Sequence, residues 1–278
     1  MSNDEIIELI GSRRTGTLSA EAGVDLGDNH ILPLTDTTVA KRIWDDHDMF
    51  VSEALTYDLV FHHTTIPVPR VRRVIRYDSG EYSVFVMDRI SGQQLAQVRP
   101  SLSIWGKLRV AFTLRSYIQQ LRAIRHPRSV ALICPCPMFG EIGPPRGPFS
   151  SYSELSAFWN AKYNAARAFA LRRAGAASTA MPSKPFDDIR PLVLTHCDLN
   201  MRNILVGDDG RLWLIDSGWS GFYPEWFEYV TARRRSELVP SAKPDHRVWE
   251  ALMPFICGPY FRQWRWFWSM AWILDYGQ

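Results

Sequence analysis

Two short stretches decide the fold of this chain: HCDLNMRN at residues 196–203 and IDSG at residues 215–218. The first places Asp198 and Asn203 five positions apart, and the second places Asp216 after an apolar run. The surrounding pattern reads as strand, loop, strand, turn, strand. We therefore expect Asp198 and Asn203 on one tight loop and Asp216 at the end of the next hairpin.

These three side chains form the set that phosphoryl transfer requires. One carboxylate accepts or orients the proton of an attacking hydroxyl, while an amide and a second carboxylate hold the Mg²⁺ that neutralises the phosphates. Asp198 takes the first role, and Asn203 and Asp216 take the second. The alternative is a surface loop rich in aspartate. That alternative does not explain why an aspartate should follow the apolar run 212–215.

The flanking segments give the order of the remaining elements. A hairpin is expected across the turn 208–210, after a short apolar strand at 192–194. Most of the rest of the second part reads as helix, including a helix over 223–237. The other predicted elements are a helix at 3–11, a strand at 37–43, a helix at 45–62, strands at 70–76 and 82–87, and helices at 102–125 and 153–174.

This order predicts an α+β fold in two parts. Gly92 marks the change from strands to long helices. We expect residues 1–90 to form a small β-rich lobe that binds nucleotide, and residues 91–278 a larger, mainly helical lobe with the catalytic loop and the acceptor site. The Pro/Gly-rich loop 127–150 and the helix after it are expected to cover the acceptor, because so long a loop in a compact enzyme is often functional.

The motifs resemble the aminoglycoside phosphotransferase and choline-kinase branch of the protein-kinase-like superfamily. The match is His-x-Asp-Leu-x-x-x-Asn at 196–203 and Ile-Asp-x-Gly at 215–218, in place of the protein-kinase His-Arg-Asp and Asp-Phe-Gly. The continuation WSGFYPEWFEY at 219–229 looks like many fungal phosphotransferase-family proteins. The resemblance implies a two-lobed kinase-like fold, with ATP and Mg²⁺ as cofactors.

The resemblance also implies nucleotide-binding residues in the first lobe. Lys41 ends a Val-Ala-Lys strand and would contact the ATP phosphates, paired with Glu53 on the following helix. The segment 85–90 resembles the family hinge, so that Met87, Asp88 and Ile90 would receive adenine through the backbone.

The sequence departs from the family pattern in three places. No Gly-x-Gly-x-x-Gly precedes Lys41, Cys197 stands where aminoglycoside kinases usually have glycine, and Ser217 stands where many relatives have a bulky aromatic residue. Two functions stay open. The first is an ATP- and Mg²⁺-dependent kinase acting on a small-molecule hydroxyl. The second is a repurposed or inactive kinase-fold protein. A protein kinase is less favoured, since no Ala-Pro-Glu follows Asp216.

Charge limits the partners. Acids outnumber bases in the first third of the chain, while bases outnumber acids in the rest. Kinases that bind polycationic aminoglycosides line the acceptor site with carboxylates, so a neutral or anionic hydroxylated metabolite, or one with a single amine, is expected instead. Glu225 and Glu228 are the acids that could bind an amine, although the first turn of a helix favours acids anyway.

Other classes find little support. Arg233-Arg234-Arg235 is a short basic run in a helical pattern, so nucleic-acid binding is not expected. The cysteine spacing does not fit zinc, and no secretory signal or membrane span is visible, so a cytoplasmic protein with reduced thiols is predicted. His196 is expected to brace the loop by hydrogen bonding to backbone. The sequence does not indicate an oligomeric state.

Overall fold

The computed structural model describes residues 1–12, 31–44, 49–76, 82–125, 137–139, 149–174, 186–238 and 244–276. The strands are β1 (Ile31–Pro33), β2 (Thr38–Trp44), β3 (Val71–Arg76), β4 (Tyr82–Asp88), β5 (Gly92–Gln94), β6 (Leu192–Thr195), β7 (Ile204–Gly207), β8 (Leu212–Leu214) and β9 (Gly221–Pro224). The helices are α1 (Asn3–Ser12), α2 (Met49–His63), α3 (Leu95–Val98), η2 (Arg99–Ser101), α4 (Ile104–Ala123), η3 (Pro137–Phe139), α5 (Tyr152–Ala174), α6 (Phe227–Leu238), α7 (Pro244–Cys257), α8 (Phe261–Trp268) and α9 (Ala271–Tyr276).

The N-terminal part is an antiparallel sheet. Helix α1 packs on one side of its strand β2, and helix α2 packs on the other side. The strand order is β1-β2-β4-β3, and β2 pairs with β4 so that Ala40 lies opposite Val86 and Lys41 opposite Phe85. Successive side chains of a strand point to opposite faces. Ala40 therefore enters the small core that includes Ile6 of α1, while Lys41 faces α2.

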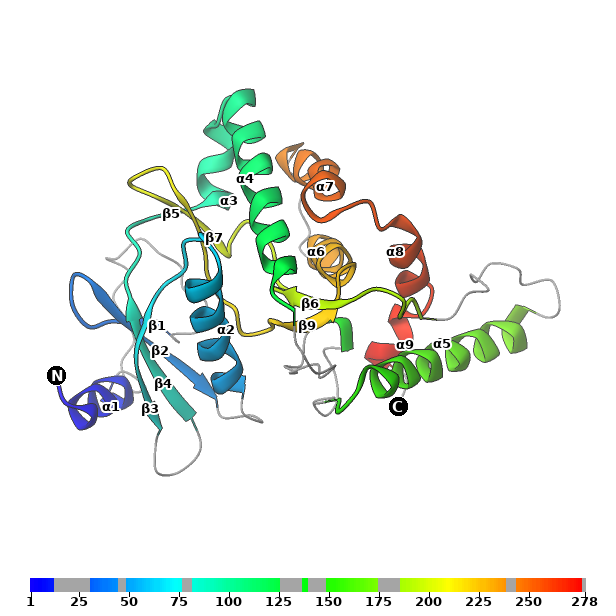
Figure 1. The fold of residues 1–278 in the computed structure, drawn as a ribbon, viewed down its shortest axis with the longest axis horizontal. Helices are drawn as coiled ribbons and strands as arrows, with labels where there is room; N and C mark the ends of the chain where they lie inside the picture. Colours follow the sequence, from blue (N-terminus) through cyan, green and yellow to red (C-terminus); the bar gives the residue numbers. More distant parts are fainter. Residues whose placement is uncertain are drawn as a thin grey trace.

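Two smaller sheets hold the segment that the sequence motifs mark. β7 pairs with both β5 and β8, and β6 pairs with β9, all antiparallel (Figure 1). The hydrogen bond from Ile215 N–H to Asn203 O, 3.0 Å long, continues the β7–β8 ladder past its last residue. The two loops that carry Asp198 and Asp216 are thereby brought side by side.

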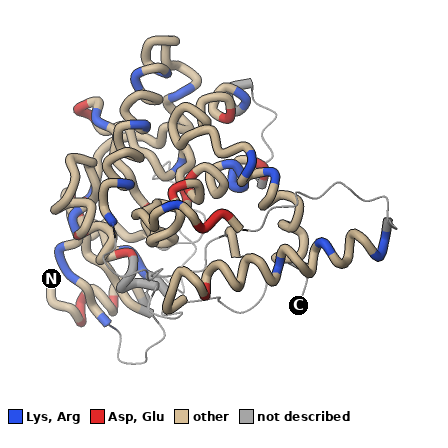
Figure 2. The backbone as a smooth tube through the Cα atoms, turned by 45° about the vertical axis from the view of Figure 1, so that its right-hand side comes forward, with Lys and Arg blue, Asp and Glu red and all other residues tan. Residues whose placement is uncertain are grey.

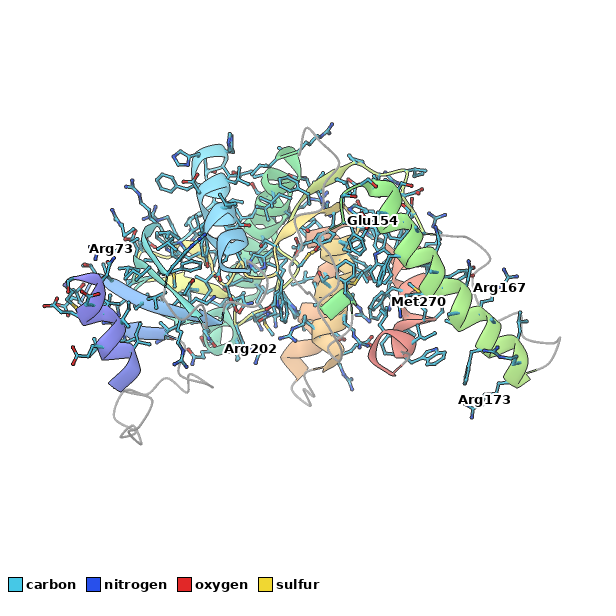
Figure 3. The ribbon with its side chains drawn as sticks, turned by 90° about the horizontal axis from the view of Figure 1, so that it is seen from below. Arg73, Glu154, Arg167, Arg173, Arg202 and Met270 are labelled. Carbon is cyan, nitrogen blue, oxygen red and sulfur yellow. The ribbon has the colours of Figure 1, made fainter. Side chains whose placement is uncertain are left out.

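Helices make up most of the later part. α4, α6 and α7 pack together behind the small sheets, and α5 extends away from them at its C-terminal end (Figure 1). Figure 3 follows α5 from Glu154 near its start to Arg167 and Arg173 toward its far end. The larger core is strongly aromatic, and its tryptophans include Trp159, Trp226, Trp249 and Trp266.

The predicted fold class is confirmed: the fold is mixed α+β, with an N-terminal antiparallel sheet and a mainly helical later part. One element was predicted wrongly. Residues 223–237 do not form one helix. Residues Gly221–Pro224 form strand β9, which pairs with β6, and helix α6 begins only at Phe227. The pairing with β6 is long-range, and helical periodicity in the local sequence does not reveal it. Most of the loop 127–150 lies outside the described residues.

Candidate active site

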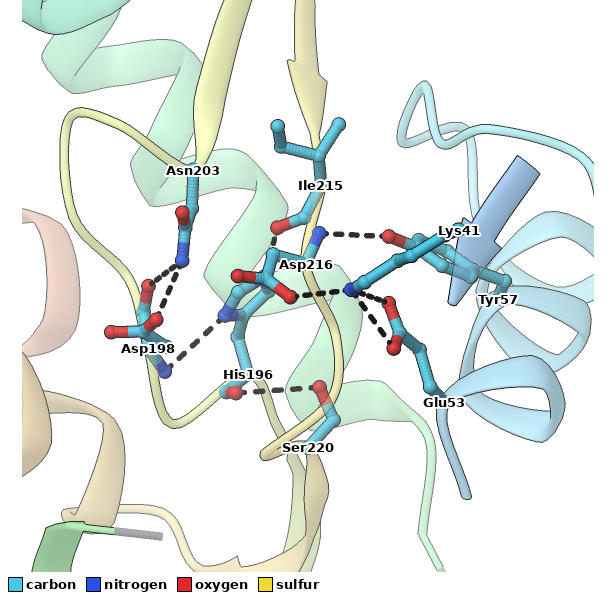
Figure 4. Close-up of polar contacts among 9 residues, drawn as sticks. All are labelled: Lys41, Glu53, Tyr57, His196, Asp198, Asn203, Ile215, Asp216 and Ser220. Atoms are coloured by element: carbon cyan, nitrogen blue, oxygen red, sulfur yellow. Dashed lines mark hydrogen bonds and ion pairs between the residues drawn. The ribbon is translucent and has the colours of Figure 1, made fainter. Parts of the chain in front are cut away.

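The Lys41–Glu53 ion pair forms as the sequence predicts. Lys41 Nζ lies 2.8 Å from Glu53 Oε1, and the Glu53 side chain is buried (Figure 4). Lys41 also reaches Asp216 Oδ1 at 2.7 Å, so a single ammonium joins β2, α2 and the segment after β8. Burial disfavours the ammonium, but the attraction of Glu53 and of Asp216 outweighs it, and the pKa of Lys41 lies above its ordinary value.

Asp216 is the more open of the two aspartates. Its side chain is about half exposed, with Oδ1 held by Lys41. Partial enclosure opposes ionisation, but the charge and the hydrogen bond of Lys41 outweigh that effect, and the pKa of Asp216 falls below its usual range. The side chain is therefore a carboxylate at neutral pH. Figure 4 shows its other oxygen on the side that faces Asn203 and Asp198.

Asp198 is buried and held from several directions. Its Oδ2 accepts a 2.7 Å hydrogen bond from Asn203 Nδ2. Its Oδ1 accepts a 3.0 Å hydrogen bond from Asn200 Nδ2 and lies 3.0 Å from Arg235 Nε on α6. Burial raises the pKa of Asp198 to about 6, although Arg235 and the two amides favour the charged form.

The two oxygens of Asp198 differ in their contacts. An ionised carboxylate offers about two acceptor positions on each oxygen. Oδ1 accepts a hydrogen bond from Asn200 and forms an ion pair with Arg235, whereas Oδ2 accepts a hydrogen bond from Asn203. Among the described contacts, Oδ2 is therefore the less engaged of the two oxygens.

The loop that carries Asp198 is braced by two buried residues. His196 Nε2 lies 3.1 Å from Ile215 O and its Nδ1 accepts from Asp198 N–H at 3.3 Å, which confirms the predicted bracing role. Glu228 is fully buried and accepts the His196 N–H at 2.6 Å. Glu228 therefore binds the backbone of this loop. It does not face a ligand amine, a contact that the sequence alone had allowed.

Backbone strain is concentrated at the same place. In the part of the chain that the structure describes, the non-glycine residues with positive φ are Cys197, at 61°, and Asp216, at 63°. Such left-handed backbone is uncommon outside glycine and clusters at functional sites. Cys197 thus adopts the backbone conformation that glycine adopts most easily.

The hinge segment lies at the end of β4. Met87 is buried and pairs with Val39, and the Asp88 carboxylate is taken by Arg72 at 2.7 Å. The backbone N–H groups of Asp88 and Arg89 donate to Arg70 and Thr37, the residues that precede β3 and β2. Among the described residues, the N–H of Ile90 meets no acceptor.

The donor set fits Mg²⁺ bound together with phosphates. No group of three or more His, Cys, Asp or Glu side chains able to hold a metal occurs among the described residues. Asn203 turns its amide nitrogen to Asp198, which leaves its side-chain oxygen facing away (Figure 4). This oxygen and the second Asp216 oxygen are the two side-chain atoms of the set that could hold a metal ion. Mg²⁺ is commonly bound by one or two carboxylates completed by phosphate oxygens and water.

Sequence reasoning missed three residues that contact the aspartates: Asn200, on the same loop as Asp198, and also Tyr57 and Arg235. Tyr57 on α2 accepts the Asp216 N–H at 2.8 Å, and Arg235 contacts Asp198 while lying over the ring of Trp219, at 4.9 Å from its centroid. The spacing from Glu53 to Tyr57, one helical turn, was the available signal for Tyr57. For Arg235 no local signal exists, since it comes from a helix distant in sequence. The glycine-poor region before Lys41, with Gly23 and Gly27, lies outside the described residues.

Comparison with known proteins places the fold. No protein-family model and no curated protein sequence matches this chain. Among solved structures, the gentamicin complex of APH(2″)-IIa matches with a TM-score of 0.51 at 12% identity, covering 95% of this chain and 84% of that one. This likeness shows the kinase-like fold of an aminoglycoside phosphotransferase, as the sequence motifs predicted.

Two further structures match over most of their length. A thermostable mutant of aminoglycoside phosphotransferase APH(4)-Ia, in a ternary complex with AMP-PNP and hygromycin B, has a TM-score of 0.49 at 14% identity and covers 95% of this chain and 88% of that one. Macrolide 2′-phosphotransferase MphH from Brachybacterium faecium has a TM-score of 0.47 at 16% identity, with 99% and 91% covered.

Proposed function

We propose that this protein is an ATP- and Mg²⁺-dependent phosphotransferase that acts on a hydroxyl group of a small molecule. The observation that carries the proposal is the single network in which Lys41 bridges Glu53 and Asp216, next to the pair formed by Asp198 and Asn203. These are the groups that phosphoryl transfer needs, on the fold that supports it in kinases. Residues 1–90 would bind the nucleotide and residues 91–278 would hold the catalytic loop and the acceptor.

The residues divide the chemistry between them. Asn203 and Asp216 would hold Mg²⁺, which neutralises charge on the phosphates when bound. Lys41, kept protonated by Glu53, would pair with phosphate oxygens, and Met87, Asp88 and Ile90 would line the adenine site. Asp198 Oδ2 would accept the acceptor proton while the acceptor oxygen bonds to the γ-phosphorus, the γ-phosphoryl bond to ADP breaks, and ADP leaves.

The acceptor side favours a neutral or anionic molecule. Both acids that could have bound an amine already have partners. Glu228 is buried and accepts a hydrogen bond from His196 N–H, and Glu225 pairs with Arg190 at 3.2 Å. Arg235 stands beside Asp198 and offsets its charge. The gentamicin that APH(2″)-IIa binds is a polycation, and this environment offers it little attraction.

Other partners find no support in the described residues. In the view of Figure 2, Lys and Arg positions are spread over many elements and form no continuous stripe for a nucleic-acid backbone. Across the described ranges, none of the helices is both long enough and apolar enough to cross a bilayer. We place the enzyme in the cytoplasm, where the buried thiols of Cys197 and Cys257 would stay reduced.

A thermal-shift titration tests this function. Mg-ATP at 100 times its dissociation constant should stabilise the native state by about 2.7 kcal/mol and raise the melting temperature by several degrees. ATP with EDTA should give a smaller rise. A screen of hydroxylated metabolites with γ-labelled ATP would then identify the acceptor. Binding of Mg-ATP without labelled product from any acceptor or water would favour the alternative, a kinase-fold protein that no longer transfers phosphate.

A further inference from the structure

The hydroxyl of Tyr57 contacts the segment that carries Asp216, one of the two carboxylates that face Lys41. It accepts the backbone N–H of Asp216 at 2.8 Å. Tyr57 is almost completely buried. A phenol oxygen can accept hydrogen bonds as well as donate one, so it can take this N–H. Together with the two ion pairs of Lys41, this contact forms a chain of four groups that runs from Glu53 through Lys41 and Asp216 to Tyr57 (Figure 4).

Helical geometry explains how one element supplies both ends of this chain of contacts. Glu53 and Tyr57 are four residues apart on α2, so they project from the same face, one turn apart. That face lies against Lys41 of β2 and against the segment after β8. Any shift of α2 therefore moves the partner of Lys41 and the partner of Asp216 together.

Asp216 has a particular need for such a partner. Its φ of 63° is left-handed, a conformation that costs free energy for a residue with a Cβ and persists only where the surroundings fix it. The next residue, Ser217, is small and buried, and Gly218 has no side chain. The position after Asp216 thus offers no bulky group to anchor the segment against α2. The Tyr57 hydroxyl is the described group that does so.

We propose that Tyr57 is a positioning residue that couples α2 to the metal-binding carboxylate, by holding the backbone of Asp216 in its left-handed conformation. This inference rests on the proposed function, because it concerns the Mg²⁺ role of Asp216. The coupling assembles the lysine–glutamate pair and the metal ligand as one unit. The hydrogen bond from Asp216 N–H to Tyr57 anchors this segment. A bulky aromatic side chain in the place of Ser217 would anchor it by packing.

The test compares two single-hydroxyl deletions, Tyr57→Phe and Tyr117→Phe. Tyr117 is also buried, and its hydroxyl donates to the backbone oxygen of Leu212 at 2.9 Å, away from Asp216. Dissociation constants for Mg-ATP, and for ATP with EDTA, are measured by calorimetry for both variants and the unmodified protein. Tyr57→Phe should weaken Mg-ATP binding by about two- to tenfold, the worth of one hydrogen bond, and leave ATP with EDTA unchanged. Tyr117→Phe should change neither constant.

The outcomes separate this inference from the proposed function. If the unmodified protein does not bind Mg-ATP, the proposed function fails and the coupling fails with it. If it binds Mg-ATP and Tyr57→Phe binds equally well, only the coupling is wrong. Equal weakening with and without Mg²⁺ would also contradict it, because that result indicates a general loss of structure.

A second measurement keeps the inference testable if Tyr57→Phe does not fold. Amide hydrogen exchange of the unmodified protein should show the Asp216 N–H protected, because its acceptor is a buried hydroxyl. Exchange of this amide as fast as that of the exposed turn residue Asp209 would overturn the coupling.

Discussion

Asp198 and Asp216 each follow a short strand in the same region, yet their surroundings are opposite. Asp198 is buried, bound at both oxygens, and its pKa is raised to about 6 by burial. Asp216 is half exposed, held at one oxygen by Lys41, and its pKa is lowered. A carboxyl with a pKa near the working pH can accept a proton, whereas one that is always ionised and open suits a cation.

The two loops also differ in what fixes them. The Asp198 loop is braced within the helical part, by Glu228 and Arg235 of α6. The Asp216 segment is tied to the N-terminal sheet and α2, through Lys41 and Tyr57. The difference teaches that the proposed base is fixed by the helical part of the molecule, and the proposed metal ligand by the N-terminal part.

The largest effect is expected from removing the proposed base. Asp198→Asn keeps the size of the side chain but replaces one accepting oxygen by an amide nitrogen, and it cannot accept the proton. Turnover of Mg-ATP, measured as phosphate transferred to an acceptor or to water, should fall by about 10²–10⁴-fold with nucleotide binding retained. Asp209→Asn is the control, because Asp209 is an exposed aspartate on the β7–β8 turn paired with Arg211. A loss below tenfold in Asp198→Asn would break the assignment.

The pH dependence of turnover sharpens the contrast between the two pKa values. Asp198 must be ionised to act as a base, so the rate should be constant above about pH 7 and fall as pH drops through about 6. At pH 5 the ionised fraction, and the rate, should be about tenfold lower. Asp216 stays ionised through this range because its pKa is lowered. Initial rates at saturating Mg-ATP between pH 5 and 8 check this; a flat profile would contradict the role of Asp198.

A smaller effect is expected at Arg235, which holds the first oxygen of Asp198. Arg235→Met should lower turnover by about three- to tenfold, with the Michaelis constant for Mg-ATP unchanged, because a charge-assisted contact to the base is lost. Arg233→Met is a matched control, since Arg233 lies two residues away on α6, is equally half-buried and covers Trp264 instead. Arg235→Lys should restore part of the rate. Equal effects of both methionine variants would show that Arg235 matters only for packing.

Local patterns were enough to predict the fold class and the first contacts of the site. The spacing of Asp198, Asn203 and Asp216 predicted two adjacent loops, and the resemblance to the kinase-like family implied the ion pair of Lys41 with Glu53. Each of these depends on short-range periodicity or on a motif. The geometry brings them together, whereas the assigned chemical roles remain proposals.

The rest depends on packing between distant segments. Residues 223–224 were expected to start a helix, but they lie in strand β9, which pairs with β6. This pairing joins residues about thirty positions apart. Arg235 reaches Asp198 only because α6 packs behind the catalytic loop, and Tyr57 reaches Asp216 only because α2 packs on the other side. Charge counts likewise could not show that Glu228 is buried and accepts a hydrogen bond from the backbone N–H of His196.

The most direct test of the account is the affinity for Mg-ATP of Asp216→Ala and Asp198→Ala, measured side by side by calorimetry. Asp216→Ala removes a metal ligand and should abolish the binding that depends on Mg²⁺. Asp198→Ala should bind Mg-ATP within about threefold of the unmodified protein and fail to turn it over. Equal loss of binding in both variants, or retained binding in Asp216→Ala, would contradict the division of roles between the two aspartates.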